Sequence, residues 1–170
     1  SKAQTRRWIL NKGTGKTIAA RSIHCSRHQG ILPFIESSCN EWQEGAAASI
    51  LQALYAYAKG GTLYLRNVDC LSGNNLEILQ HFWESIKKDL AVKGPEEAAG
   101  IIFSVSRKHY SNAYDLNEWL KDNTVELPLP DLADRREDLR DLVNFFINEY
   151  TLSVEFDFTE HAWRLLEAFS

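Results

Sequence analysis

A glycine-rich stretch near the start of the chain constrains the fold more than any other feature. The apolar run Trp8-Ile9-Leu10 predicts a buried strand, and Gly13-Thr14-Gly15-Lys16-Thr17 follows it and leads into a helical sequence. The two glycines of this second run let the backbone turn tightly, so that successive N–H groups can point at one anion. The N-terminus of the next helix adds a partial positive charge. In such a loop Lys16 reaches the β- and γ-phosphates of a nucleotide, and the Thr17 hydroxyl binds Mg²⁺.

One position departs from the full phosphate-loop pattern. That pattern requires a glycine where this chain has Leu10. Either Leu10 weakens the turn out of the strand, or further residues belong between Leu10 and Asn11. The chain contains no methionine, which favours the second interpretation. The alternative to a phosphate loop is a glycine-rich turn that only caps an ordinary helix.

Composition restricts the class of protein. The chain has 170 residues, of which 44% are hydrophobic and 25% charged, enough for one well-buried domain or a domain with a small appendage. Its net charge of −4 argues against a general nucleic-acid binder, so DNA is expected to be bound only through domains outside this chain. The three cysteines lack metal-ligand spacing and are expected to be reduced thiols. The sequence contains no membrane-spanning apolar run and no signal peptide, which predicts a cytoplasmic protein without membrane contact.

Strands and helices are predicted to alternate through the first three quarters of the chain. Apolar β-prone runs predict strands at 32–37, 62–65, 100–106 and 124–127, and helical periodicity predicts helices at 46–58, 76–90 and 115–120. Such alternation is typical of a parallel sheet covered by helices on both faces. Leu127-Pro128-Leu129-Pro130 then interrupts the pattern, and two helical stripes follow. We therefore expect an α/β core over residues 1–130 and a small all-helical domain over 131–170.

Segments in three places resemble the AAA+ domain of bacterial enhancer-binding proteins, the sigma-54-dependent transcription activators. The first segment, Gly13 to Lys16 with Ala19 to His24, is similar to that family's G-T-G-K and A-R-A-I-H. The second, Gly60 to Leu65, is similar to its G-G-T-L-F-L. The third, Leu129 to Leu139, is similar to its L-P-P-L-R-E-R-R-E-D-I. All three occur in family order. The resemblance implies a P-loop AAA+ core with ATP or ADP at the ends of its strands, a helical lid from about Asp131 onward, and a homo-oligomeric ring.

The chain departs from this family at the positions that carry its chemistry. Arg66 and Asn67 occupy the positions of the Walker B Asp and Glu, which hold magnesium and polarise the attacking water. Ser106 stands at the position of the sensor asparagine. The segment from Tyr114 to Lys121 lacks the finger arginines, and the G-A-F-T-G-A loop that contacts sigma-54 is missing. No catalytic residue is therefore expected.

These features together predict a degenerate regulatory module of a bacterial transcription factor. It is expected to bind ATP or ADP through Gly13 to Thr17, with Thr17 as the ligand of any Mg²⁺, and to hydrolyse nucleotide poorly or not at all. Its expected partners are further copies of itself and RNA polymerase or a regulatory protein.

Rival interpretations stay open at this point. One is an active ATPase whose missing acidic groups come from Asp69 or Glu36. Another is a scaffold that serves oligomerisation or docking and keeps only a vestigial loop. A third is a module that responds to cyclic di-GMP, a ligand of some relatives, with positive charge supplied by Arg21 and Arg27.

A pair of histidines on the loop helix is a weaker candidate site. His24 and His28 are four residues apart, a spacing that can bind a metal ion. No acidic or cysteine residue follows at a suitable spacing to complete such a site. An exposed helix face is the expected structure for this pair.

Overall fold

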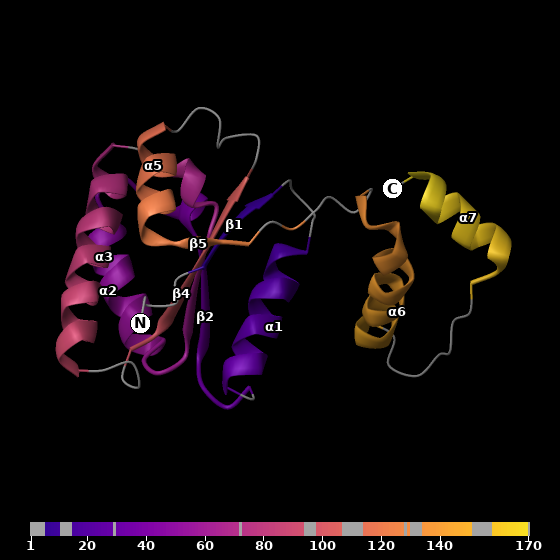
Figure 1. Cartoon of the computed structure of the whole chain (residues 1–170), viewed down its shortest axis with the longest axis horizontal. Helices are drawn as coiled ribbons and strands as arrows, with labels where there is room; N and C mark the ends of the chain where they lie inside the picture. Colours follow the sequence, from indigo (N-terminus) through magenta and orange to yellow (C-terminus); the bar gives the residue numbers. More distant parts are fainter. Residues whose placement is uncertain are drawn as a thin grey trace. The chain divides into compact units, whose positions relative to one another are not determined.

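A parallel sheet is the centre of the first part of the chain. The computed structural model describes residues 6–10, 15–28, 30–71, 73–93, 98–106, 114–127, 129, 134–150 and 158–169. The chain divides into two compact units, residues 1–129 and 130–170. In the first unit, the strands run in the order β2-β3-β4-β1-β5, and every neighbouring pair is parallel (Figure 1). The bounds are β1 Arg6–Leu10, β2 Phe34–Ser38, β3 Thr62–Arg66, β4 Gly100–Ser106 and β5 Val125–Glu126.

Helices cover both faces of this sheet, as the alternating pattern predicts. They are α1 Lys16–His28, α2 Ala47–Tyr57, α3 Gly73–Lys93 and α5 Tyr114–Asn123, with short 3₁₀ turns η1 Cys39–Glu41 and η2 Val68–Cys70. The larger core lies on the side of α2, α3 and α5, where Leu63 and Phe103 of the sheet pack against Leu51, Trp83 and Leu120. A smaller core lies on the side of α1 (Figure 1).

The period of two along β3 sends alternate side chains to these two cores. Leu63 and Leu65 belong to the larger core, whereas Tyr64 packs with Ala20 of α1 and Ile102 of β4. Arg66 follows Tyr64 at the same period and therefore lies on the α1 side. This face of the sheet ends beside the predicted phosphate loop, because the loop follows the carboxyl end of β1 and all strands run in parallel.

The double glycine before β3 is required by a close approach of the backbone. Gly60 ends the α2 region with a φ of +76°, which favours glycine. A Cβ on Gly61 would lie 2.0 Å from the carbonyl oxygen of Pro33. The same carbonyl accepts a hydrogen bond from the Thr62 N–H at 2.8 Å, so β3 enters the sheet directly against the segment that leads into β2.

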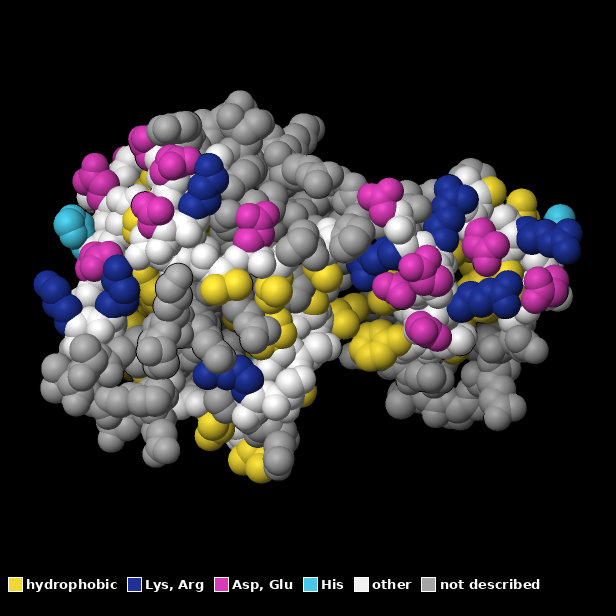
Figure 2. All heavy atoms as spheres, viewed as in Figure 1, with side chains coloured by type: hydrophobic (Ala, Val, Ile, Leu, Met, Phe, Trp, Pro, Cys, Tyr) yellow, Lys and Arg dark blue, Asp and Glu magenta, His cyan; other side chains and the backbone are white. Residues whose placement is uncertain are grey.

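The described residues of the second unit are helical. They form η4 Arg136–Asp138, α6 Leu139–Tyr150 and α7 Glu160–Phe169. Arg140 joins the two helices, since its guanidinium lies 5.2 Å from the centre of the Trp163 ring and 3.6 Å from carboxylate oxygens of both Glu160 and Glu167. The hydroxyl of Thr159 accepts a hydrogen bond from the Ala162 N–H at 3.3 Å, as expected of an N-cap. Basic and acidic side chains are mixed over the visible face of α6 and α7 (Figure 2).

Nothing among the described helices of either unit combines the length and apolar character that crossing a membrane requires. The function of residues 131–170 as a lid stays a prediction.

Candidate functional site

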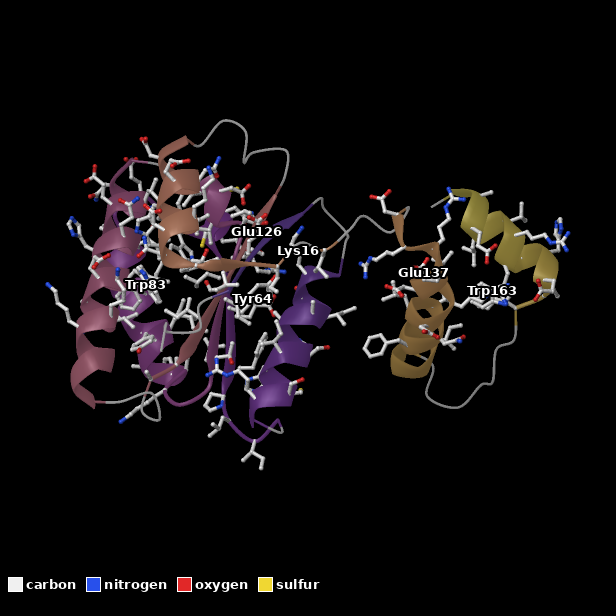
Figure 3. The ribbon with its side chains drawn as sticks, viewed as in Figure 1. Lys16, Tyr64, Trp83, Glu126, Glu137 and Trp163 are labelled. Atoms are coloured by element: carbon white, nitrogen blue, oxygen red, sulfur yellow. The ribbon has the colours of Figure 1, made fainter. Side chains whose placement is uncertain are left out.

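The structure describes the second part of the predicted phosphate loop. Gly15 has a φ of +76°, a conformation that glycine adopts without strain. The helix α1 begins at the next residue, and the Gly15 carbonyl accepts a hydrogen bond from the Ala19 N–H at 3.0 Å. Lys16 and Thr17 therefore stand in the first turn of α1 (Figure 3). Backbone N–H groups of a first helical turn have no acceptor within their helix, which makes this turn suited to an anion.

The rest of the predicted loop lies outside the described residues. This applies to Gly13 and Thr14, and also to Asn11, so the prediction of additional residues after Leu10 stays untested. Leu10 itself is the last residue of β1 and pairs with Ser106 of β4. The strand therefore delivers the chain to the carboxyl edge of the sheet, where the loop is expected.

Arg66 is the last residue of β3, at the position of the Walker B aspartate. Its Nε lies 3.1 Å from Glu36 Oε1, and Nη2 of Arg21 on α1 lies 3.8 Å from Glu36 Oε2. Glu36 belongs to the neighbouring strand β2, where it pairs in register with Tyr64. The Arg66 side chain remains 39% exposed, compared with 23% for Glu36. Two guanidinium groups thus share one carboxylate, and this edge of the sheet is positively charged on the α1 side.

Asn67 occupies the position of the Walker B glutamate, and its amide is held by neighbouring polar groups. It has a φ of 54°, and among the described non-glycine residues it alone has a positive φ. Its Nδ2 donates to Ser38 Oγ at 3.0 Å and to Asn40 Oδ1 at 3.1 Å, and the Ser38 hydroxyl also donates to Asn40. Asparagine tolerates this left-handed conformation well. An amide cannot act as a base, and the expectation that no catalytic residue stands here stays a prediction.

The two acidic residues that could replace the Walker B pair lie in different surroundings. Glu36 is paired with the two arginines already described. Asp69 lies in η2, is 8% exposed and adjoins two thiols. Burial raises the pKa of the Cys39 thiol, and the neighbouring Cys70 and Asp69 raise it further. Burial also raises the pKa of Cys70, with Asp69 adding to the effect.

Tyr64 and Ser104 add two hydroxyl groups that the sequence analysis does not single out. Both residues are 1% exposed, and Tyr64 lies between the sheet and α1 (Figure 3). Burial raises the pKa of Tyr64, the nearby hydroxyls of Ser104 and Thr17 oppose this, and the Glu36 and Arg66 charges act in opposite directions. The period of two along β3 is the signal that could have placed Tyr64 on the α1 side. No local pattern in the sequence indicates that Ser104 lies beside it.

The structure corrects the sequence-based expectation for the histidine pair on α1. His24 is 4% exposed, its Nδ1 lies 3.0 Å from Thr62 Oγ1, and its ring packs edge-on against Phe34. The expectation of an exposed face is therefore wrong for His24, because α1 presents it to the smaller core. The side chain of His28 lies outside the described residues. Among the residues that are described, no group of three or more His, Cys, Asp or Glu side chains could hold a metal ion.

The two arginines considered for a large anionic ligand lie at different places. Arg21 is paired with Glu36 and lies over the Phe34 ring, 5.2 Å from its centre. The Arg27 guanidinium packs against Gly100, where an added Cβ would lie 2.5 Å from Nη1. Gly100 begins β4, so Arg27 is at the amino end of the strands, opposite to the loop. The structure does not bring the two side chains into one site.

Known proteins with a similar sequence include bacterial transcription regulators. No model of a known protein family matches the chain. The transcriptional regulatory protein GlrR of Escherichia coli K12 is 28% identical over 158 residues, covering 81% of this chain and 36% of GlrR. The regulatory protein AtoC of the same organism is 28% identical over 165 residues, covering 82% of this chain and 35% of AtoC. The chain is therefore similar in sequence to bacterial transcriptional regulatory proteins, the class that its motifs resemble. It spans about a third of the length of these relatives.

Solved structures confirm the predicted P-loop AAA+ fold. The crystal structure of NtrX from Brucella abortus matches with a TM-score of 0.67 at 20% identity, over 99% of this chain and 42% of NtrX. NtrX has also been crystallised in complex with ATP and with ADP, and these structures match with TM-scores of 0.63 and 0.65. The AAA domain of FIGL-1 matches with a TM-score of 0.61 at 18% identity, over 97% of this chain and 53% of that one.

Proposed function

We propose that this chain is a regulatory AAA+ module that binds ATP or ADP without hydrolysing it and has lost the contact with sigma-54. Its homology to sigma-54-dependent regulators and the nucleotide complexes of NtrX support nucleotide binding. The Arg66–Glu36 ion pair at the end of β3 is the observation that carries the loss of hydrolysis. The module acts in the bacterial cytoplasm as an oligomer, with RNA polymerase or a regulatory protein as partner, and DNA is bound through domains outside this chain.

The proposed loss of hydrolysis follows from charge at the edge of the sheet. Magnesium in a phosphate loop needs an anionic group at the end of β3, and Arg66 supplies a cation instead. A guanidinium binds phosphate oxygens directly in a planar, two-pronged geometry. Arg66 can therefore neutralise part of the phosphate charge that magnesium would otherwise neutralise. Asn67 provides no base, and loss of a finger arginine alone lowers turnover by about 10³–10⁵ in related hydrolases.

Calorimetry with ATP, ADP and cyclic di-GMP, each with Mg²⁺ and with EDTA, tests this function. We expect ATP or ADP to bind with nearly equal affinity in both buffers, and Lys16→Ala to weaken binding at least tenfold because it removes the charge on the phosphates. Turnover under saturating ATP and Mg²⁺ should equal the background of the buffer. Hydrolysis that Lys16→Ala abolishes would instead establish the active ATPase, and absence of any nucleotide binding would establish the scaffold. Tight binding of cyclic di-GMP alone would favour the third rival.

A second experiment reverses the charge at Arg66. In Arg66→Asp a carboxylate would stand beside Glu36, and paired carboxylates with the Thr17 hydroxyl form a typical magnesium environment. We expect nucleotide affinity in this variant to become dependent on Mg²⁺. The matched control, Arg66→Gln, removes the cation without adding an acid and should weaken binding equally with and without the metal. Metal dependence in the unaltered protein that matches Arg66→Asp would contradict the proposal.

A further inference from the structure

Two buried hydroxyl groups on the α1 side of the sheet are not accounted for by the fold. Tyr64 and Ser104 are each 1% exposed, and within the described part of the chain neither hydroxyl oxygen completes a hydrogen bond. A buried hydroxyl is normally paired, because an unpaired one loses its bonds to water without replacement. Neither side chain is needed in this form to fill space, since phenylalanine and alanine would occupy nearly the same volumes.

The place of these hydroxyls links them to the phosphate loop. Tyr64 packs under α1 against Ala20, and Thr17 lies one helical turn before Ala20 on the same face of α1. The Thr17 hydroxyl is near enough to the phenol to influence the Tyr64 pKa. Ser104 lies on the neighbouring strand β4, two residues beyond Ile102, the register partner of Tyr64. Ser104, Tyr64 and Thr17 thus form a row of three hydroxyl-bearing residues on the side of the sheet that α1 covers. Tyr64 itself lies between the sheet and α1 (Figure 3).

We propose that Tyr64 is a positioning residue that orients the Thr17 hydroxyl to donate a hydrogen bond to a bound phosphate. This inference rests on the proposed nucleotide function. A phosphate oxygen is only an acceptor, so the Thr17 proton must point toward it. Thr17 then accepts from Tyr64, and Tyr64 accepts from Ser104. Hydrogen bonds aligned in this way strengthen one another, and each hydroxyl of the row gains a partner.

A magnesium ion would require the opposite alignment of the same row. The metal binds a lone pair of the Thr17 oxygen, and the Thr17 proton must then point inward to an acceptor. Arg66 makes the edge positive, which favours the alignment toward phosphate over the alignment toward a metal. With the row aligned toward phosphate, Tyr64 supports nucleotide binding that needs no metal.

A double-mutant cycle on ATP affinity in EDTA tests this positioning. The variants are Tyr64→Phe, Thr17→Val and both together, with Tyr57→Phe as control, because Tyr57 is 72% exposed on α2. We expect Tyr64→Phe to weaken ATP binding about five- to tenfold, which is the net contribution of one hydrogen bond. Once Thr17→Val has removed the hydroxyl that Tyr64 orients, the second substitution should change affinity less than twofold. Tyr57→Phe should leave affinity unchanged, and circular dichroism of each variant verifies the fold.

The outcomes separate this inference from the function on which it rests. If the unaltered protein binds no nucleotide, the proposed function and this inference both fail. If it binds ATP but Tyr64→Phe has the same affinity, or the two substitutions are additive, only the positioning by Tyr64 is refuted. A loss that occurs in Mg²⁺ but not in EDTA would show that Tyr64 supports metal binding, which also overturns the inference.

Discussion

Burial of His24 makes the stability of the fold depend on pH. Its pKa is lowered chiefly by burial, a bond with the backbone of Leu32 opposes this, and the positive charge of Arg27 lowers it further. The unfolded chain therefore binds a proton near pH 6.5, whereas the folded chain does so only at lower pH. The stability that neutral His24 provides is complete above the unfolded pKa and is lost as pH falls through the folded one.

This behaviour gives a prediction for a single substitution. The free energy of unfolding should fall between pH 7 and pH 5, by about 1.4 kcal/mol for each unit by which the His24 pKa is lowered. His24→Gln keeps a polar group near Thr62 but does not titrate, so its unfolding free energy should depend less on pH. Urea unfolding of both proteins at several pH values measures the difference. Equal pH dependence in the two proteins would show that His24 does not titrate with folding.

At the scale of residues, the sequence predicts which groups stand at the site but not how they pair. Arg66 and Asn67 could be placed because they directly follow a recognisable strand. The pairing of Arg66 with Glu36 depends on β2 lying beside β3, and no local pattern records which strands become neighbours. Tyr64 was missed for a related reason, because its importance comes from Ser104, 40 residues away in the chain and one strand away in the sheet.

At the scale of elements, the spacing of hydrophobic residues and the glycines that end helices predicted most strands and helices of the first unit. Helices and strands each have a characteristic spacing of apolar residues, and this spacing can be read from a short stretch of sequence. The order β2-β3-β4-β1-β5 is a tertiary property, and so are the 3₁₀ turns η1 and η2. The start of β3 combines both scales. Gly60 is a local signal that ends a helix, whereas Gly61 is required by a contact with Pro33 that lies 28 residues earlier.

Gly61→Ala should therefore destabilise the protein strongly. The added Cβ meets the Pro33 carbonyl and would disturb the first hydrogen bond of β3, so we expect a loss of about 2–4 kcal/mol, typical of overpacking combined with a broken backbone bond. Gly45→Ala is the control, since Gly45 has a φ of +78° but open space around it and should lose only about 1 kcal/mol. Thermal unfolding of both variants checks this. Similar losses at the two positions would mean that the contact is relieved cheaply.

At the scale of the whole molecule, the described core clusters of the sheet draw only on residues up to Leu129. The second unit has its own buried residues, Leu139 and Trp163. A fragment of residues 1–129 should therefore unfold cooperatively by itself. The fragment 130–170 should not, since chains of roughly 40 residues rarely fold without a disulfide, metal or partner. Circular dichroism during heating tests both fragments, and an unfolded 1–129 fragment would contradict the division.

The position of β1 has a consequence for how the protein is made. β1 precedes β4 and β5 in the chain, yet it lies between them in the sheet, with Arg6 in register with Ile102 and with Val125. One edge of β1 cannot be paired until Ile102 has been synthesised and the other not until Val125 has been, which at about 5–20 residues per second takes several seconds or longer. During that time β1 and the start of the loop remain an unpaired, apolar segment. The strand that leads into the proposed nucleotide site is thus synthesised well before its partner strands, and nascent chains interrupted before β4 would expose a segment prone to aggregate.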